Sequence, residues 1–70
     1  MESVNTRFAK RLKTLRKKHK ITQEQLAEAA EIDYKHIQDL ESKNPPAATL
    51  KTIEKIAKAF RISLSKLMDF

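Results

Sequence analysis

The stretch that decides the fold is residues 22–41, TQEQLAEAAEIDYKHIQDLE. In its first half, Thr22 followed by Gln25 forms a capping-box pattern, in which a hydroxyl and an amide satisfy each other's backbone donors. Apolar residues at helical spacing follow this cap. The pattern predicts a helix over 23–30.

The second half of the stretch predicts another helix, over 34–41, with Asp33 as its N-cap and Ile37 and Leu40 as its buried stripe. The corner between the two helices is short, and the chain contains no glycine. A left-handed backbone conformation costs a residue other than glycine roughly 1 kcal/mol or more. We expect the packing around Glu31 to impose that conformation.

The rest of the chain gives three further amphipathic segments and no strand-like alternation. Helices are expected over 4–18, over 50–60 behind the cap Thr49, and in a short fifth segment behind the cap Ser63. The expected core stripe of the fourth helix contains Leu50, Ile53, Ile56, Ala57 and Phe60. Residues 1–70 are therefore predicted to form one all-α domain of five helices.

Composition and charge narrow the class of protein. The 70 residues have no cysteine, and no apolar run approaches the roughly 20 residues of a membrane span. The net charge is +6, and residues 7–20 hold eight basic residues and no acidic one. Such a block favours a polyanionic partner, although a solvated helix face with excess charge is the alternative. We expect a soluble, intracellular protein.

The segments LKTLRKKHKITQEQLAEAAEIDYKHIQDLE and TLKTIEKIAKAFRISLSKL resemble the helix-turn-helix domain of the Cro and phage-repressor type, or XRE family. The resemblance covers about residues 7–68. It rests on a small residue at Ala27 and on apolar residues at Leu26, Ala30, Ile32, Ile37 and Leu40. It implies a compact, lambda-repressor-like five-helix domain and a sequence-specific DNA-binding regulator of transcription. The chain departs from the family pattern at Glu31 and Arg61, where glycine is usual.

Base-reading residues are expected on the outer face of the third helix. At 100° per residue, a buried stripe of Ile37 and Leu40 turns three polar side chains outward, with Tyr34 at the margin. By the resemblance, these positions read bases in the major groove. A lysine can bond guanine, a glutamine adenine, and an aspartate the amino group of cytosine. The expected base readers are Lys35, Gln38, Asp39 and Tyr34.

Phosphate contacts are expected at two backbone sites. The N-terminus of the second helix presents free N–H groups, and in the resembling family this end lies on the DNA backbone. The turn after the third helix is the second anchor by the same resemblance. The expected phosphate contacts are Thr22, Gln23, Ser42, Lys43, Asn44 and Arg11. The resemblance also implies a structural ion pair between Arg16 and Glu41.

A two-fold homodimer on a pseudo-palindromic operator is expected, because one recognition helix reads only a few base pairs. The C-terminal segment has more apolar surface than closing so small a core requires. The expected dimer residues are Leu64, Leu67, Met68 and Phe70. In the alternative, the two leucines only close the domain's own core.

Three other classes of function are alternatives to DNA binding: an enzyme, a protein-interaction module and a membrane-binding helix. The chain has no paired nucleophile and base, no glycine-rich phosphate loop and, with only His19 and His36 besides its carboxylates, no metal set. We therefore expect no enzyme activity, cofactor or small-molecule substrate. The main alternative is a protein-interaction module, such as an antitoxin, that uses the apolar C-terminus. A basic amphipathic helix over 7–20 for membrane surfaces is a third reading, but its apolar residues are needed in the core. The expected location of this prokaryotic or phage-encoded protein is the cytoplasm, where it associates with the nucleoid when it is bound to DNA.

Overall fold

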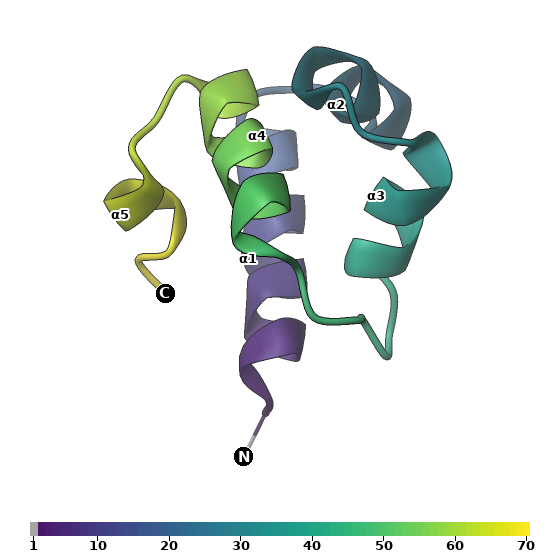
Figure 1. Cartoon of the computed structure of the whole chain (residues 1–70), viewed down its shortest axis with the longest axis vertical. Coiled ribbons are helices and arrows are strands. Elements are labelled where there is room, and N and C mark those ends of the chain that lie inside the picture. The colour runs from purple at the N-terminus through teal and green to yellow at the C-terminus, as the bar shows by residue number, and fades with distance from the viewer. Residues whose placement is uncertain (1) are drawn as a thin grey trace.

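The computed structural model describes residues 2–70, which form five helices and no strand (Figure 1). The all-α prediction is therefore confirmed. The third helix ends one residue earlier than expected, because Glu41 is its C-cap rather than its last residue. The helices are α1 (Val4–Lys18), α2 (Gln23–Ala30), α3 (Tyr34–Leu40), α4 (Leu50–Phe60) and α5 (Leu64–Leu67).

The helices surround a single core. In Figure 1, α4 lies in front of α1, α2 crosses at the upper end, α3 lies on one side, and α5 lies on the other. Every helix contributes to the core, and the largest fully buried side chains are Leu12, Leu26, Ile37, Leu40, Ile56 and Leu67. α3 and α5 therefore occupy opposite sides of the domain.

Two predictions about apolar residues need correction. Leu67, expected at a dimer interface, is fully buried in the core and is not available to a partner. Leu50, expected in the core stripe of α4, is 84% exposed. Leu50 is the first residue of α4, and no other element covers its side chain. The helical period identifies the residues on one face of a helix, but it does not show where other helices stop covering that face.

Three corners between helices each contain a residue in the left-handed backbone conformation. Among residues 2–70, three residues have positive φ: Lys20, Glu31 and Arg61. Glu31 is left-handed at φ 56° and ψ 45°, as expected, and Arg61 is left-handed at φ 58° and ψ 43°. The left-handed Lys20 was not anticipated.

Each corner is closed by the same pair of hydrogen bonds. At the corner after α2, the N–H of Ile32 donates to Ala27 O at 2.9 Å and that of Glu31 to Glu28 O at 3.2 Å. This is the Schellman arrangement, in which the residue after the left-handed one is apolar and packs back on the helix. At all three corners that residue is an isoleucine packed against the core, namely Ile21, Ile32 and Ile62.

Candidate nucleic-acid interface

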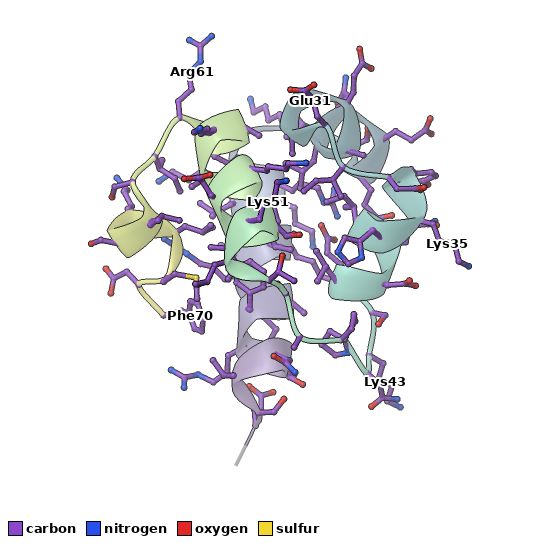
Figure 2. The ribbon with its side chains drawn as sticks, in the orientation of Figure 1. Glu31, Lys35, Lys43, Lys51, Arg61 and Phe70 are labelled. Carbon is purple, nitrogen blue, oxygen red and sulfur yellow. The ribbon has the colours of Figure 1, made fainter. Side chains whose placement is uncertain are left out.

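The outer face of α3 is polar and open to solvent. Lys35, Gln38 and Asp39 are exposed, while Ile37 and Leu40 on the opposite face are buried. Figure 2 shows Lys35 projecting away from the body of the domain. The three side chains expected to read bases therefore share one accessible face.

The margin and start of α3 are also defined. Tyr34, the fourth expected reader, begins the helix and is partly exposed. Asp33 caps the helix, and its Oδ1 accepts from the N–H of Lys35 at 2.9 Å. The carboxylate of Asp33 thus satisfies a helix-terminal donor and fixes where α3 starts.

The far end of α3 is tied to α1 by a two-point ion pair. Arg16 Nε donates to Glu41 Oε2 at 2.7 Å, and Nη2 donates to Glu41 Oε1 at 2.8 Å. Arg16 Nη1 donates to Ile21 O at 3.1 Å. Glu41 is only 2% exposed, so these partners, rather than water, bond its carboxylate. The bond with Glu41 raises the pKa of Arg16, although burial acts in the opposite direction.

The N-terminus of α2 carries the expected capping box. Thr22 Oγ1 accepts from the N–H of Gln25 at 3.1 Å, and Gln25 Oε1 accepts from the N–H of Thr22 at 2.8 Å. Gln23 Nε2 donates to Glu41 Oε1 at 3.3 Å, so the side chain expected on phosphate also joins the buried ion pair. Because the capping box uses two of the terminal donors, the N–H groups of Gln23 and Glu24 are the ones that face outward.

In the turn after α3, Ser42 is bonded within the turn, while Lys43 and Asn44 are open to solvent. Ser42 uses both its N–H, at 3.1 Å, and its hydroxyl, at 2.6 Å, to bind Asp39 O. Its N–H is therefore engaged inside the turn rather than directed outward as expected. Lys43 and Asn44 are exposed, and Figure 2 shows Lys43 projecting from this turn.

Arg11, expected on phosphate, instead holds the C-terminal segment. Its Nε donates to Leu67 O at 3.1 Å and its Nη2 to Lys66 O at 2.7 Å. One turn earlier, Arg7 Nη2 donates to Phe70 O at 2.8 Å, and its guanidinium lies 5.3 Å from the centre of the Phe70 ring. The basic block of α1 thus includes two side chains that cap and clamp the end of the chain. Their four-residue spacing places them together on one flank, but the sequence does not show what they meet.

Most of the chain matches one protein family. The model of the helix-turn-helix family matches residues 12–67, which include the whole of α2, the corner and α3. The chain belongs to the helix-turn-helix family. This confirms the resemblance to the Cro and phage-repressor type. No significant match was found among curated proteins or among solved structures.

Membership gives the helix-turn-helix protein a DNA-binding function of the transcription-regulator type. The family is one of DNA-binding regulatory domains and is not typically enzymatic. Among the described residues of this helix-turn-helix protein, no helix combines the length and apolar character needed to cross a membrane.

Proposed function

We propose that the protein is a sequence-specific regulator of transcription that inserts α3 into the major groove of double-stranded DNA. Lys35 and Gln38 read base edges, with Asp39 and Tyr34 as further contacts. The observation that carries this proposal is the exposed polar face of α3 on a helix whose end is fixed by the Arg16–Glu41 pair. A fixed helix keeps its side chains in register with the base pairs.

Phosphate contacts position the helix in this proposal. The outward N–H groups at the start of α2, beside Thr22 and Gln23, favour a phosphate because the helix dipole is positive there. Lys43 and Asn44 supply the second anchor beyond α3, where both are exposed. Two anchors on either side of a base-reading face fix the register of the protein on the duplex.

The protein binds as a two-fold homodimer on a pseudo-palindromic operator. Two recognition helices about 34 Å apart read half-sites separated by one helical turn, which supplies the discrimination that one short helix lacks. Leu64, Met68 and Phe70 are exposed on the side opposite α3, which leaves the recognition face open for DNA. We propose a repressor, or a controller of a restriction-modification system, that works in the prokaryotic cytoplasm.

Selection of bound sites from random duplexes tests this proposal. Lys35→Ala and Gln38→Ala should each weaken binding to the selected site by about 1 to 3 kcal/mol and relax the preference at one position. Lys43→Ala should weaken binding to all DNA sequences alike. It should also reduce the slope of log affinity against log salt concentration by about one. Lys51→Ala is the matched control, because it removes the same charge from α4, away from Lys35 in Figure 2.

An unchanged sequence preference in both Lys35→Ala and Gln38→Ala would show that the recognition face has been placed wrongly. The exposed C-terminal side chains of Leu64, Met68 and Phe70 favour one alternative function. In that alternative, the domain is an interaction module, as in an antitoxin, and binds another protein there. Selection that enriches no duplex over random DNA would favour the interaction module over the regulator.

A further inference from the structure

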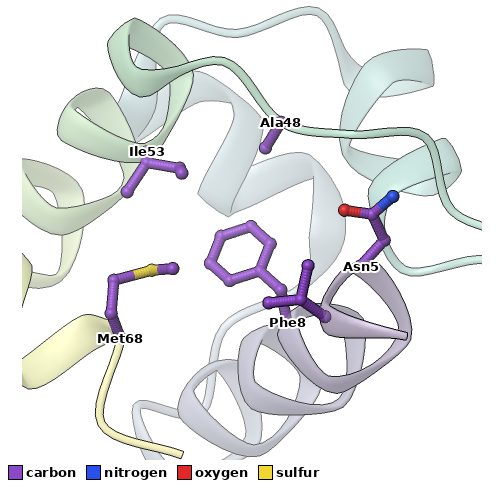
Figure 3. A pocket seen from close by; sticks show the side chains of 6 residues that line it. Asn5, Phe8, Ala48, Ile53 and Met68 are labelled. Carbon is purple, nitrogen blue, oxygen red and sulfur yellow. The ribbon is translucent and has the colours of Figure 1, made fainter. Parts of the chain in front are cut away.

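A small apolar pocket opens between α1, the start of α4 and the C-terminal segment. Its volume is about 120 Å³, and Figure 3 shows Phe8 at its centre with Ile53 and Met68 along one side. The lining residues are Val4, Asn5, Phe8, Ala48, Ile53 and Met68. Five of these six are apolar and none is charged, so the pocket suits an apolar side chain rather than an anion or a polar ligand.

Leu50 lies close in the chain to two residues that line this pocket. It lies two residues after Ala48 and one helical turn before Ile53, both of which line the pocket. At 84% exposure it is the most exposed large apolar side chain among the described residues. Met68, which lines the pocket, is also partly exposed. The surface therefore has an apolar projection next to an apolar hollow.

Two-fold symmetry turns such a surface into a self-complementary one. In an interface with a two-fold axis, residue i of one copy contacts residue j of the other, and the reverse contact follows automatically. We propose that Leu50 of each copy inserts into the Phe8–Ile53–Met68 pocket of the other. This inference rests on the proposed homodimer and moves the centre of its interface from α5 to the start of α4.

The size and charge of the chain set the strength of this dimer. A standard interface buries roughly 800 Å² per partner, which is about a sixth of the 4947 Å² surface of this chain. One projection and one hollow make a smaller contact than that, and each copy carries a charge of +6, which opposes association. The dimer should therefore be weak in solution and form mainly on adjacent half-sites, where the effective concentration is high.

Cysteine cross-linking tests the contact directly, because the natural chain has no cysteine. Copies with Leu50→Cys and copies with Met68→Cys, distinguished by mass, are mixed with DNA carrying two half-sites and oxidised. The mixed cross-link should exceed either self cross-link at least tenfold, since each engineered cysteine faces the other position of its partner. Leu64→Cys should cross-link poorly with itself. Only self cross-links of Leu50→Cys, only those of Leu64→Cys, or none at all would overturn the inference.

Affinity for one and two half-sites separates this inference from the proposed function. Leu50→Lys should weaken binding to the two-half-site duplex at least tenfold and leave binding to a single half-site unchanged. Lys51→Gln, at the adjacent exposed position, is the control and should not reduce the cooperativity. Cooperativity that survives Leu50→Lys would overturn the inference alone. A wild-type protein with no preference for its half-site would overturn the proposed function.

Salt gives an independent readout. Added salt screens the repulsion between two chains of charge +6, so the yield of the mixed cross-link without DNA should rise with salt. Binding to the half-site should fall over the same range, because phosphate contacts release counterions. A cross-link yield that falls with salt would contradict an apolar contact between two like-charged copies.

Discussion

Removing the guanidinium of Arg16 is the most demanding test of how this domain holds α3 in place. The variant Arg16→Ala deletes both bonds to Glu41, at 2.7 and 2.8 Å, and the bond to Ile21 O at 3.1 Å. Glu41 is then left with the amide of Gln23 at 3.3 Å and almost no solvent. The change therefore strands a buried carboxylate rather than merely losing an attraction.

The expected magnitude follows from that burial. Truncating one partner of a buried pair costs about 3 to 5 kcal/mol, whereas an exposed pair is worth about 0 to 1. A domain of this length has a free energy of unfolding of roughly 4 to 10 kcal/mol, so the loss takes a large part of it. Since 1 kcal/mol shifts the midpoint by about 4 to 8 °C at this size, Arg16→Ala should melt at least about 12 °C lower.

Thermal and urea unfolding measured by circular dichroism provide the assay. Lys17→Ala is the control, because it removes a neighbouring exposed charge and should change stability by no more than about 0.5 kcal/mol. The double variant Arg16→Met with Glu41→Leu should recover most of the loss, since it removes both charges. Equal melting points for Arg16→Ala and Lys17→Ala would refute the structural role of the pair.

The pKa shift of Arg16 adds a pH dependence to this test. Its folded-state pKa is raised by the bond with Glu41, so its contribution is complete below the ordinary arginine value and is lost only as pH rises through the raised one. The stability gap between wild type and Arg16→Ala should therefore persist from neutral to mildly alkaline pH. If the difference in stability between wild type and Arg16→Ala disappears over that pH range, a group other than Arg16 is responsible for it.

The remaining predictions concern the corners and the C-terminal clamp. Glu31→Gly and Arg61→Gly should each raise the free energy of unfolding in urea by up to about 1 kcal/mol, because glycine adopts the left-handed conformation without a steric penalty. Glu28→Gly, inside α2, should instead lower the free energy of unfolding by about 1 kcal/mol. If glycine lowers the free energy of unfolding at all three positions, the corners are not strained. Arg11→Ala should speed hydrogen exchange of the α5 amides, since its guanidinium binds two carbonyls at the end of that helix. Lys10→Ala is the control and should leave the exchange rates of the α5 amides unchanged, because Lys10 pairs with Glu2. Equal exchange rates in the two variants would show that Arg11 does not hold α5.

The helix boundaries could be read from the sequence because cap residues mark them. Thr22, Asp33, Thr49 and Ser63 each accept a backbone hydrogen bond at the helix start that the sequence predicted. These bonds are local, spanning two or three residues, so a linear pattern contains the information needed. The corner at Glu31 was predictable for the same reason.

The roles of the basic side chains could not be read in this way. Arg11 meets the carbonyl of Lys66, which lies 55 residues away along the chain. That long-range contact decides whether an arginine on the edge of α1 faces DNA or the C-terminal segment. The local spacing of residues does not predict such a contact. Leu50 was misplaced for a related reason, because its period matches the core stripe but no element covers it.

The three corners explain how a chain without glycine turns sharply between its helices. The triplets KIT at 20–22, EID at 31–33 and RIS at 61–63 each combine a left-handed charged residue, a packed isoleucine and an N-cap. The left-handed residue costs about 1 to 2 kcal/mol, whereas full burial of an isoleucine contributes about 1.5 to 3. Because each isoleucine is partly buried against the core, its burial is of the same order as the strain. The cap that follows starts the next helix without a longer loop. The direction of α3 is thus set by the anchoring of Ile32 in the core, and backbone freedom at Glu31 is not required.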